Sequence, residues 1–345
     1  MISTRSKRVL VTGGRGFLGR AVVERLVKRG DRVCSFSRGY YEELESMGVV
    51  TIQGDLSDGE ALDRAVNGMD LVFHVAGKPG IWGKYSDFYQ ANYMGTKHVV
   101  DACIKHKVPA LVYTSSPAVV VSGKDLEGVD ESAPYPDRFH SHYAKTKAMA
   151  EQYVTKKAKE YRNKKDGLKA ISLRPHLIWG PGDNHIIPRI IARAKRLVRV
   201  GRRNCLIDTV YIDNAADAHI LAADKLETNP ELSGKVYFIS QGEPLAIWDM
   251  VNRILKSAHL EPVERSVPYP VVWLIGSLLE IIYKIFRLPG EPLMTRFIAN
   301  ELATAHWFDI SAARRDLGYN PKISIEAGLI RLEEWLQKNH PSHPG

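Results

Sequence analysis

The sequence predicts an α/β protein, with a doubly wound parallel sheet followed by a smaller, mostly helical lobe. Three observations predict this fold class. Short apolar runs alternate with amphipathic stretches through the first half, as in parallel sheets covered by helices on both faces. Three glycines with the spacing Gly-x-x-Gly-x-x-Gly directly follow the first apolar run. After about residue 181 the alternation weakens and helical periodicity dominates.

Hydrophobic periodicity places the individual elements. Strands rich in Val, Leu, Ile and Phe are expected at residues 7–13, 31–37, 49–55, 70–77, 110–116 and 168–175. Helices are expected between them at 19–30, 59–68, 92–107 and 143–154. The second half shows a short strand and a helix within 208–226, a strand at 234–240, and helices at 246–258, 271–286 and 324–339. We therefore expect a first domain over 1–180 and a substrate lobe over 181–345, with short segments that return to the first domain.

Composition narrows the functional classes. The net charge of +9 favours anionic partners, namely a phosphorylated cofactor, an acidic substrate or an anionic membrane surface. No nucleic-acid-binding motif accompanies the charge, so no nucleic acid partner is expected. The three cysteines lie far apart and the twelve histidines show no ligand spacing, so no metal and no disulfide framework are expected. These features, and the lack of a signal-peptide pattern before the glycines, predict a cytoplasmic protein with possible membrane association.

The glycine turn predicts dinucleotide binding. A pyrophosphate can approach the free N–H groups at a helix N-terminus only where no Cβ blocks it. We expect Gly13 to form the tight turn, Gly16 to admit the phosphate and Gly19 to let the helix pack on the strand. A glycine triplet alone is a weak signal, but this one lies between a strand and an amphipathic helix. The residues of the turn predicted to bind cofactor are Gly13, Arg15, Gly16, Phe17, Leu18 and Gly19.

The end of the second strand indicates which dinucleotide binds. An acidic residue there would bind the ribose of NAD, but this chain has Arg38 instead, with Arg15 nearby in the turn. Because a guanidinium suits a 2′-phosphate, we predict a preference for NADP(H). NAD(H) stays possible if Arg38 only stacks on the adenine. Asp55 is expected to accept from the adenine amino group, and Leu56 and Ala76 are expected beside the cofactor.

Tyr143 and Lys147 form the predicted catalytic pair. They lie four residues apart, on one face of a helix. A neighbouring ammonium should lower the high pKa of the tyrosine by favouring phenolate. Ser115 or Ser116, after the fifth strand, is expected to supply a hydroxyl to the substrate oxygen. Together these groups provide a proton donor, a tuning cation and an oxyanion partner for carbonyl chemistry beside a hydride source.

These motifs in this order resemble the extended short-chain dehydrogenases/reductases over nearly the whole chain. The segments that carry the resemblance are TGGRGFLG, GDL, NYMGT, YTSS, Tyr-x-x-x-Lys, LRPHLIWGPGD and DTVYIDNAADAH. The resemblance implies a fold of the Rossmann type and catalytic Ser116, Tyr143 and Lys147, with Asn92 steadying the helix that shapes the site. It places Pro175 to Leu177 against the nicotinamide. It also implies a homodimer.

LRPHLIWGPGD and the apolar segment near residue 270 resemble the 3β-hydroxysteroid dehydrogenase branch of this family. Within it, the chain is similar to sterol-4α-carboxylate 3-dehydrogenases and to 2-alkyl-3-oxoalkanoate reductases, and AGKPGIWG and YTSSPAVV are closer to the latter. The resemblance implies interconversion of an alcohol and a ketone at carbon 3 of a bulky apolar acid. Arg38 without an acid favours reduction of a long-chain 2-alkyl-3-oxo acid.

Two later segments suggest how such a substrate is handled. Residues 188–204 are rich in Arg and Lys and would attract a carboxylate or an anionic membrane, unless they form only a solvated helix face. Val271–Phe286 is too short and too charged to span a bilayer. It is expected to lie at a membrane interface, or to line the substrate pocket or pack in a dimer.

Two other functions remain open at this stage. A nucleotide-sugar epimerase or dehydratase would use the same three catalytic residues, but would need a polar second lobe that binds a diphosphate. A non-catalytic NADP(H)-binding regulator would have no need of the pair Tyr143 and Lys147.

Overall fold

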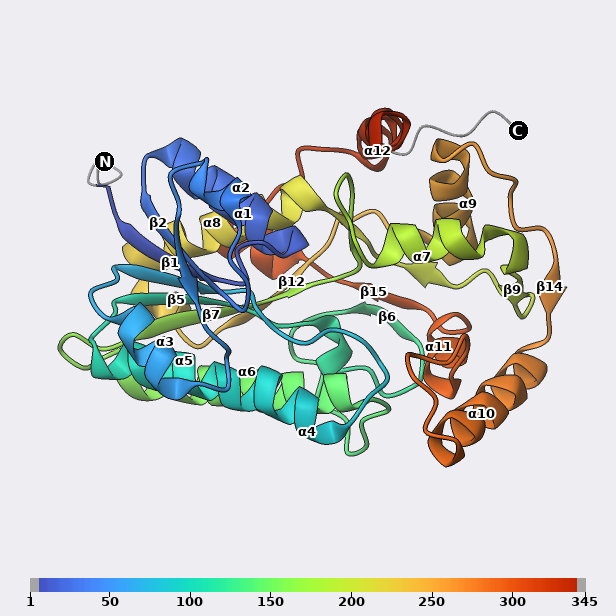
Figure 1. Ribbon diagram of the computed structural model, residues 1–345, viewed down its shortest axis with the longest axis horizontal. Helices are drawn as coiled ribbons and strands as arrows, with labels where there is room; N and C mark the ends of the chain where they lie inside the picture. The colour runs from blue at the N-terminus through green and yellow to red at the C-terminus, as the bar shows by residue number, and fades with distance from the viewer. Residues whose placement is uncertain (1–5, 340–345) are drawn as a thin grey trace.

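A seven-stranded sheet forms the centre of the computed structural model, which describes residues 6–339 (Figure 1). Its strands are β1 (Arg8–Thr12), β2 (Arg32–Ser37), β3 (Val50–Gln53), β4 (Leu71–His74), β5 (Ala110–Thr114), β7 (Lys169–Pro175) and β12 (Val236–Ile239). All pairs are parallel, and the spatial order is β12-β7-β5-β4-β1-β2-β3. The predicted doubly wound parallel sheet is confirmed.

Helices cover both faces of this sheet, which explains its continuous apolar strands. One face packs against α1 (Phe17–Arg29) and α8 (Ile212–Thr228). The other packs against α3 (Gly59–Val66), α5 (Gly95–Lys105) and α6 (His142–Tyr161). The central strand β1 is accordingly apolar on both sides, with Val9, Leu10 and Val11 fully buried.

The second lobe contains a small sheet that the sequence analysis did not predict. Its strands, in spatial order, are β13 (Leu245–Ala246), β10 (Leu206–Ile207), β15 (His306–Phe308) and β6 (Leu126–Val129). The helices of this lobe are α7 (Ile186–Arg193), α9 (Ile247–Ser257), α10 (Tyr269–Ile285) and α11 (Arg296–Glu301). Strands of two to four residues are too short to show a period-2 pattern, which is why only the longer helices were predicted.

The chain crosses between 1–180 and 181–345 in both directions. Strand β6 belongs to the small sheet of the second lobe, whereas β12 and α8 complete the main sheet and one of its faces. The remaining elements are α2 (Glu42–Glu45), α4 (Tyr85–Phe88), β8 (Ile178–Trp179), β9 (Arg199–Val200), β11 (Val210–Tyr211), β14 (Ser266–Val267), α12 (Ile325–Asn339), 3₁₀ turns at 117–119, 194–196 and 230–232, and π turns at 89–94 and 313–317.

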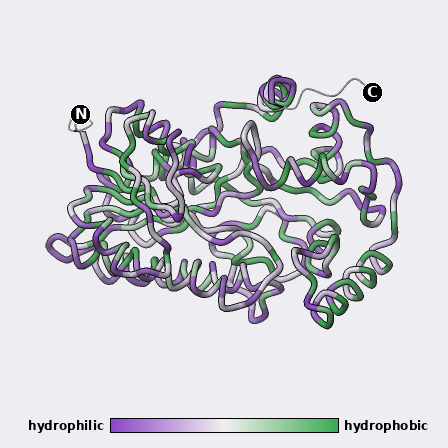
Figure 2. The backbone as a smooth tube through the Cα atoms, viewed as in Figure 1, coloured by the Kyte–Doolittle hydropathy of each residue, from purple (hydrophilic) through white to green (hydrophobic). Residues whose placement is uncertain are grey.

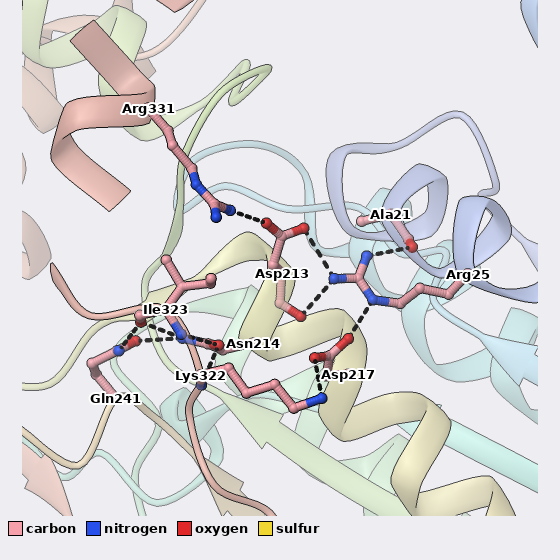
Figure 3. Close-up of polar contacts among 9 residues, drawn as sticks. All are labelled: Ala21, Arg25, Asp213, Asn214, Asp217, Gln241, Lys322, Ile323 and Arg331. Carbon is pink, nitrogen blue, oxygen red and sulfur yellow. Dashed lines mark hydrogen bonds and ion pairs between the residues drawn. The ribbon is translucent and has the colours of Figure 1, made fainter. Parts of the chain in front are cut away.

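A polar network joins the first helix to the last (Figure 3). Arg25 of α1 donates to Asp217 at 2.5 Å and to Asp213 at 2.9 Å, both on α8. Asp213 also pairs with Arg331 of α12 at 3.1 Å. Asn214 accepts from the backbone N–H groups of the segment before α12 at 2.9 and 3.1 Å. The network fixes α1, which starts at the glycine turn, to the helices around it.

Helix α10 leaves most of its apolar surface exposed. Only Val272, Gly276 and Glu280, spaced four residues apart, are buried. At Gly276 a Cβ would lie 2.7 Å from the backbone of Thr295, and Glu280 accepts from Arg296 at 2.7–2.9 Å, so this narrow stripe docks on α11. Leu279 is half-buried. Nine large apolar residues of α10 and its C-cap are at least 39% exposed, namely Val271, Trp273, Leu274, Ile275, Leu278, Ile281, Ile282, Ile285 and Phe286.

Figure 2 shows α10 as a largely hydrophobic segment at the outer edge of the second lobe. Within residues 6–339, no helix combines the length and the hydropathy needed to cross a membrane.

Candidate active site

The glycine turn has the geometry expected for binding an anion at the start of α1. Gly13 has a φ of +71°, and a Cβ there would come within 3.0 Å of Ala76. A Cβ on Gly19 would lie 2.1 Å from the carbonyl oxygen of Gly13, so the helix approaches the turn too closely for any side chain. At Gly16 a Cβ would meet only that same oxygen, at 3.1 Å, and otherwise open space. No side chain caps α1 and no acid lies in its first turn, so the residues present fit a pyrophosphate.

The predicted adenine-side residues lie at the neighbouring strand ends. Arg38 follows β2 and is exposed, and its charge helps to lower the pKa of Asp55. The larger cause of that shift is Ser57, which donates to Asp55 from its N–H and its hydroxyl at 2.9 and 2.7 Å. Arg15 lies 4.6 Å from the ring centre of Tyr41. Leu56, between β3 and α3, is half-buried and packs against the start of α5.

Ser116, Tyr143 and Lys147 meet at the carboxyl edge of the main sheet. Ser116 follows β5, and its hydroxyl accepts from the N–H of Ala118 at 3.2 Å. Tyr143 lies in the first turn of α6 and forms a hydrogen bond with Ser116. Lys147, one turn later, donates from Nζ to the carbonyl of Thr114 at 2.5 Å. The neighbouring Ser115 is buried and turns away from this hydrogen-bonded pair, since its hydroxyl has no partner among the described residues.

The pKa of Tyr143 shifts in the opposite direction to the one expected from its neighbour Lys147. Burial raises the pKa of Tyr143, and the hydrogen bond from Ser116 is what opposes that rise. The Lys147 ammonium instead bonds Thr114 and lies 4.4 Å from the ring centre of Tyr113. Burial lowers the pKa of Lys147 to about 7, with Glu151 acting against the decrease. The phenol therefore keeps its proton at neutral pH, and the lysine can exchange a proton there.

A chain of buried hydrogen bonds, which the sequence analysis missed, links the ends of β1 and β4 to α5 behind this site. The hydroxyl of Thr96 donates to the carbonyl of Asn92 at 2.6 Å, so it must accept from Nε2 of His74 at 3.0 Å. His74 is then protonated on Nε2, and its Nδ1 accepts from Thr12 at 2.7 Å. Thr12 in turn accepts from the N–H of Ala76 at 3.2 Å. Burial and the charge of Lys147 lower the pKa of His74 to about 3, which keeps the ring neutral.

Asn92 lies where the sequence analysis expected a residue that steadies the site. It sits in the π turn before α5, and its side chain accepts from the N–H of Lys78 at 2.7 Å. The same amide donates to the carbonyl of Lys78 and to the hydroxyl of Thr146 on α6, at 3.2 and 3.3 Å. It thereby joins the loop after β4 to the helix that carries Tyr143 and Lys147.

Glu151 and Arg174 form a buried ion pair below the site, also missed from sequence. The two guanidinium bonds measure 2.6 and 2.9 Å, and the side chains are 0% and 2% exposed. Tyr135 donates to the same carboxylate at 2.7 Å. Glu151 lies one turn after Lys147 on α6, so it is also the anion that supports the charge on Lys147. Its spacing from Lys147 was a signal that the sequence did offer.

The segment from Pro175 to Leu177 forms the next part of the edge. Pro175 ends β7 and is buried, and the N–H of Ser115 donates to Leu173 of that strand at 2.6 Å. The segment therefore adjoins the strand end that carries Ser116. Leu177 is half-buried and has a φ of +43°.

The basic segment of the second lobe becomes three different elements. It comprises the later part of α7, a 3₁₀ turn and strand β9. Arg189 pairs with Glu291 at 3.0 Å, and Glu291 also lies against Gly80 in the loop after β4. Arg203 pairs with Asp125 at 2.5 Å. The segment is thus partly neutralised rather than one continuous cationic helix face.

The fold and the comparisons define an NAD(P)-dependent oxidoreductase of the extended short-chain dehydrogenase/reductase class, acting on CH–OH groups. Within that class, the chain belongs to the 3-beta hydroxysteroid dehydrogenase/isomerase family, whose model matches residues 10–269. The resemblance stated from the motifs is confirmed.

Relatives within the family act on lipid-like or sterol carboxylate substrates, as their names state. The chain is 44% identical to the 2-alkyl-3-oxoalkanoate reductase of Shewanella oneidensis, over 97% of this chain and 88% of that protein. The enzyme of the same name from Stenotrophomonas maltophilia is also 44% identical, over 94% and 98%. The sterol-4-alpha-carboxylate 3-dehydrogenase of Candida albicans is 30% identical, over 98% and 100%.

Solved structures confirm the fold. The UDP-glucuronic acid 4-epimerase from Bacillus cereus in complex with NAD superposes with a TM-score of 0.73 at 22% identity, covering 96% of this chain and 99% of that one. At this identity the likeness concerns the fold alone.

Proposed function

We propose that this protein uses NADPH to reduce the 3-oxo group of a long-chain 2-alkyl-3-oxo acid. The observation that carries the proposal is the meeting of Ser116, Tyr143 and Lys147 at the carboxyl edge of the main sheet, where burial raises the pKa of Tyr143. Reduction of a ketone needs a group that gives up a proton as charge develops on the oxygen. Burial raises the pKa of this phenol and so keeps its proton in place at neutral pH, whereas oxidation of an alcohol needs the phenolate as a base.

Each residue of the site has a separate role in this reaction. Tyr143 and Ser116 hold the ketone oxygen by hydrogen bonds. Tyr143 transfers its proton to that oxygen as the C–O double bond is reduced. Lys147, with a pKa of about 7, stabilises the phenolate that forms and returns a proton to it. Bound NADPH supplies the hydride that adds to C3, and the glycine turn holds its pyrophosphate.

The names of the relatives and the net charge of the chain support a 2-alkyl-3-oxo acid as the substrate. The relatives that are 44% identical are named for 2-alkyl-3-oxoalkanoate reduction. The net charge of +9 favours an acidic substrate. A second candidate, oxidation of a 3β-hydroxysteroid or sterol carboxylate with NAD, is supported by the relative from Candida albicans that is 30% identical.

Arg38 supports the choice of NADPH, and its replacement tests cofactor and reaction together. With a 2-alkyl-3-oxo acid, we expect absorbance at about 340 nm, where reduced nicotinamide absorbs, to fall with NADPH. In Arg38→Asp, we expect kcat/KM for NADPH to fall about 100-fold, because a bidentate guanidinium contact with the 2′-phosphate is lost and a repulsive charge is added. The kcat/KM for NADH should change by less than threefold. The control is Arg64→Asp, which changes an exposed arginine on α3.

Two outcomes would contradict this proposal. Turnover of a 3β-hydroxysteroid with NAD⁺, and none of the oxo acid, would establish the second candidate. An unchanged preference for NADPH in Arg38→Asp would remove Arg38 from the cofactor site.

We further propose that the protein is a cytoplasmic homodimer that contacts membranes through Val271–Phe286. The exposed apolar residues of α10 are joined by Lys284 and Arg287, a combination that favours an anionic bilayer surface. The end of α10 also adjoins the site, because Tyr283 packs edge-on against Trp82 in the loop after β4, at 6.3 Å between ring centres. A lipid-like substrate would then enter from the bilayer.

Flotation with vesicles tests the contact. We expect the protein to float with vesicles that contain phosphatidylserine, and the double change Leu278→Glu and Ile282→Glu to reduce the bound fraction at least tenfold. Each change places a charge on the surface that would enter the lipid boundary. Ile330→Glu is the control, because Ile330 is a 59% exposed apolar residue on α12. If wild type stays unbound and the double variant alone loses a dimer in light scattering, α10 instead forms the homodimer interface.

A further inference from the structure

Leu177 has a backbone conformation that leucine rarely adopts. Its φ is +43°, in the left-handed region, which residues with a Cβ disfavour. Such strain persists only when surrounding contacts hold the residue in place. One contact is evident, since the N–H of Val210 donates to the carbonyl of Leu177 at 3.3 Å. That single long hydrogen bond is a weak constraint. The Leu177 side chain also packs against the apolar core of the second lobe, and the preceding residue adds a further constraint.

His176 is held much more tightly than a residue of a connecting loop. Its side chain is 9% exposed, and its N–H donates to the carbonyl of Ile239 in β12 at 3.0 Å. The imidazole meets His306 edge-on, with ring centres 5.0 Å apart, and Phe308 edge-on at 5.2 Å. The backbone of Asp208 interacts with the ring, whose Nδ1 has no hydrogen-bond partner among the described residues.

The groups that hold His176 belong to the second lobe and are themselves fixed. His306 and Phe308 lie on β15, and the N–H of Phe308 donates to Asp208 at 2.7 Å. His306 bonds the carbonyl of Glu301, at the end of α11, through Nε2 at 3.0 Å. Phe308 stacks on Phe238 of the main sheet at 4.3 Å. The His176 ring is therefore clamped where the two lobes meet.

The residues that hold the His176 ring lie next to the carboxyl edge of the main sheet, where Ser116 and Lys147 lie. Strand β7 runs beside β5, whose end carries Thr114 and Ser116, and Lys147 bonds Thr114. Residues 175–177 leave β7 at this same edge, where ligands of doubly wound sheets bind. The backbone path of Leu177 therefore sets the wall of the site on the side of Ser116 and Lys147.

We propose that His176 is a positioning residue. Its ring, clamped by His306 and Phe308, holds Leu177 in the left-handed conformation and so shapes the cofactor pocket at its nicotinamide end. The second lobe would thereby control how well the cofactor is seated. This inference rests on the proposed function in one respect, namely that NADPH binds at this edge.

A double-mutant cycle on NADPH affinity tests the proposal, because glycine adopts a φ of +43° without strain and needs no clamp. We expect His176→Ala to weaken NADPH binding about tenfold in the wild-type background. In the Leu177→Gly background the same change should weaken it less than twofold. The control is His259→Gly, which relieves another left-handed residue, with φ +54°, on an exposed turn and should give no rescue. Fluorescence of bound NADPH reports each dissociation constant.

Binding of a second ligand shows whether His176→Ala affects only the nicotinamide end of the cofactor pocket. Binding of 2′,5′-ADP, which lacks the nicotinamide half, should be unchanged by His176→Ala, whereas a general loss of structure would weaken both ligands. Equal losses for NADPH in the two backgrounds, or no loss at all, would overturn the proposal. If wild type fails to bind NADPH, the proposed function fails first. If His176→Ala does not fold, His306→Leu removes the clamp from the second lobe and should show the same dependence on Leu177.

Discussion

Replacing Tyr143 by phenylalanine is expected to lower kcat about 1,000-fold while NADPH affinity changes by less than twofold. The hydroxyl is the group that donates the proton, and a positioned general acid contributes about 10²- to 10⁴-fold to a rate. Phenylalanine keeps the ring, so the packing around α6 is preserved. The hydroxyl bonds Ser116 rather than the glycine turn, which is why cofactor affinity should be spared. Stopped-flow single turnovers with NADPH and the oxo acid measure the chemical step directly.

Tyr85 supplies the matched control for this change. Its ring packs near the start of α6, against His142 at 5.4 Å, and its hydroxyl has only a weak contact with a methionine sulfur at 3.9 Å. Tyr85→Phe should leave kcat within twofold of wild type. Near-normal turnover by Tyr143→Phe would show that another group provides the proton and would contradict the proposed mechanism.

Removing the Glu151 carboxylate is expected to destabilise the fold by about 3–5 kcal/mol, the range seen when one partner of a buried ion pair is lost. In Glu151→Ala the Arg174 guanidinium, 2% exposed, would stay charged in the core, and the Tyr135 hydroxyl would lose its acceptor. Urea unfolding followed by circular dichroism measures the change in free energy. The exposed Glu160→Ala, in the same helix, removes only surface pairs with Lys157 and Lys164 and should cost less than about 1 kcal/mol.

The double change Glu151→Met and Arg174→Met sharpens this test. Replacing both charges by apolar groups removes the unpaired cation, so much of the lost stability should return. If Glu151→Ala unfolds at the same urea concentration as wild type, the ion pair does not support the fold. If the double variant is no more stable than Glu151→Ala, the loss comes from packing rather than from the unpaired charge.

Local signals in the sequence were sufficient to place the elements that we propose to contact the cofactor. The turn from Gly13 to Gly19 combines a strand, three glycines and a helix start within a few residues, and short-range sterics determine its shape. The spacing of Tyr143 and Lys147 places both on one face of α6 for the same local reason. Contacts between residues that lie far apart in the sequence could not be predicted in this way. Nothing near Arg174 in the sequence identifies Glu151 as its partner, and nothing near His176 identifies His306.

The sequence by itself determined the doubly wound sheet, the glycine turn, the placement of Tyr143 and Lys147 on one face of α6, and the family. These depend on periodicity and on contacts between residues that are close in the chain. Only the tertiary structure decided the charge states and the supporting contacts. Lys147, a near neighbour in the sequence, was expected to lower the pKa of Tyr143. Its ammonium bonds Thr114 instead, and burial raises the pKa of Tyr143. The strained Leu177 and the clamp on His176 likewise arise from segments more than a hundred residues apart, whose meeting depends on how the whole chain packs.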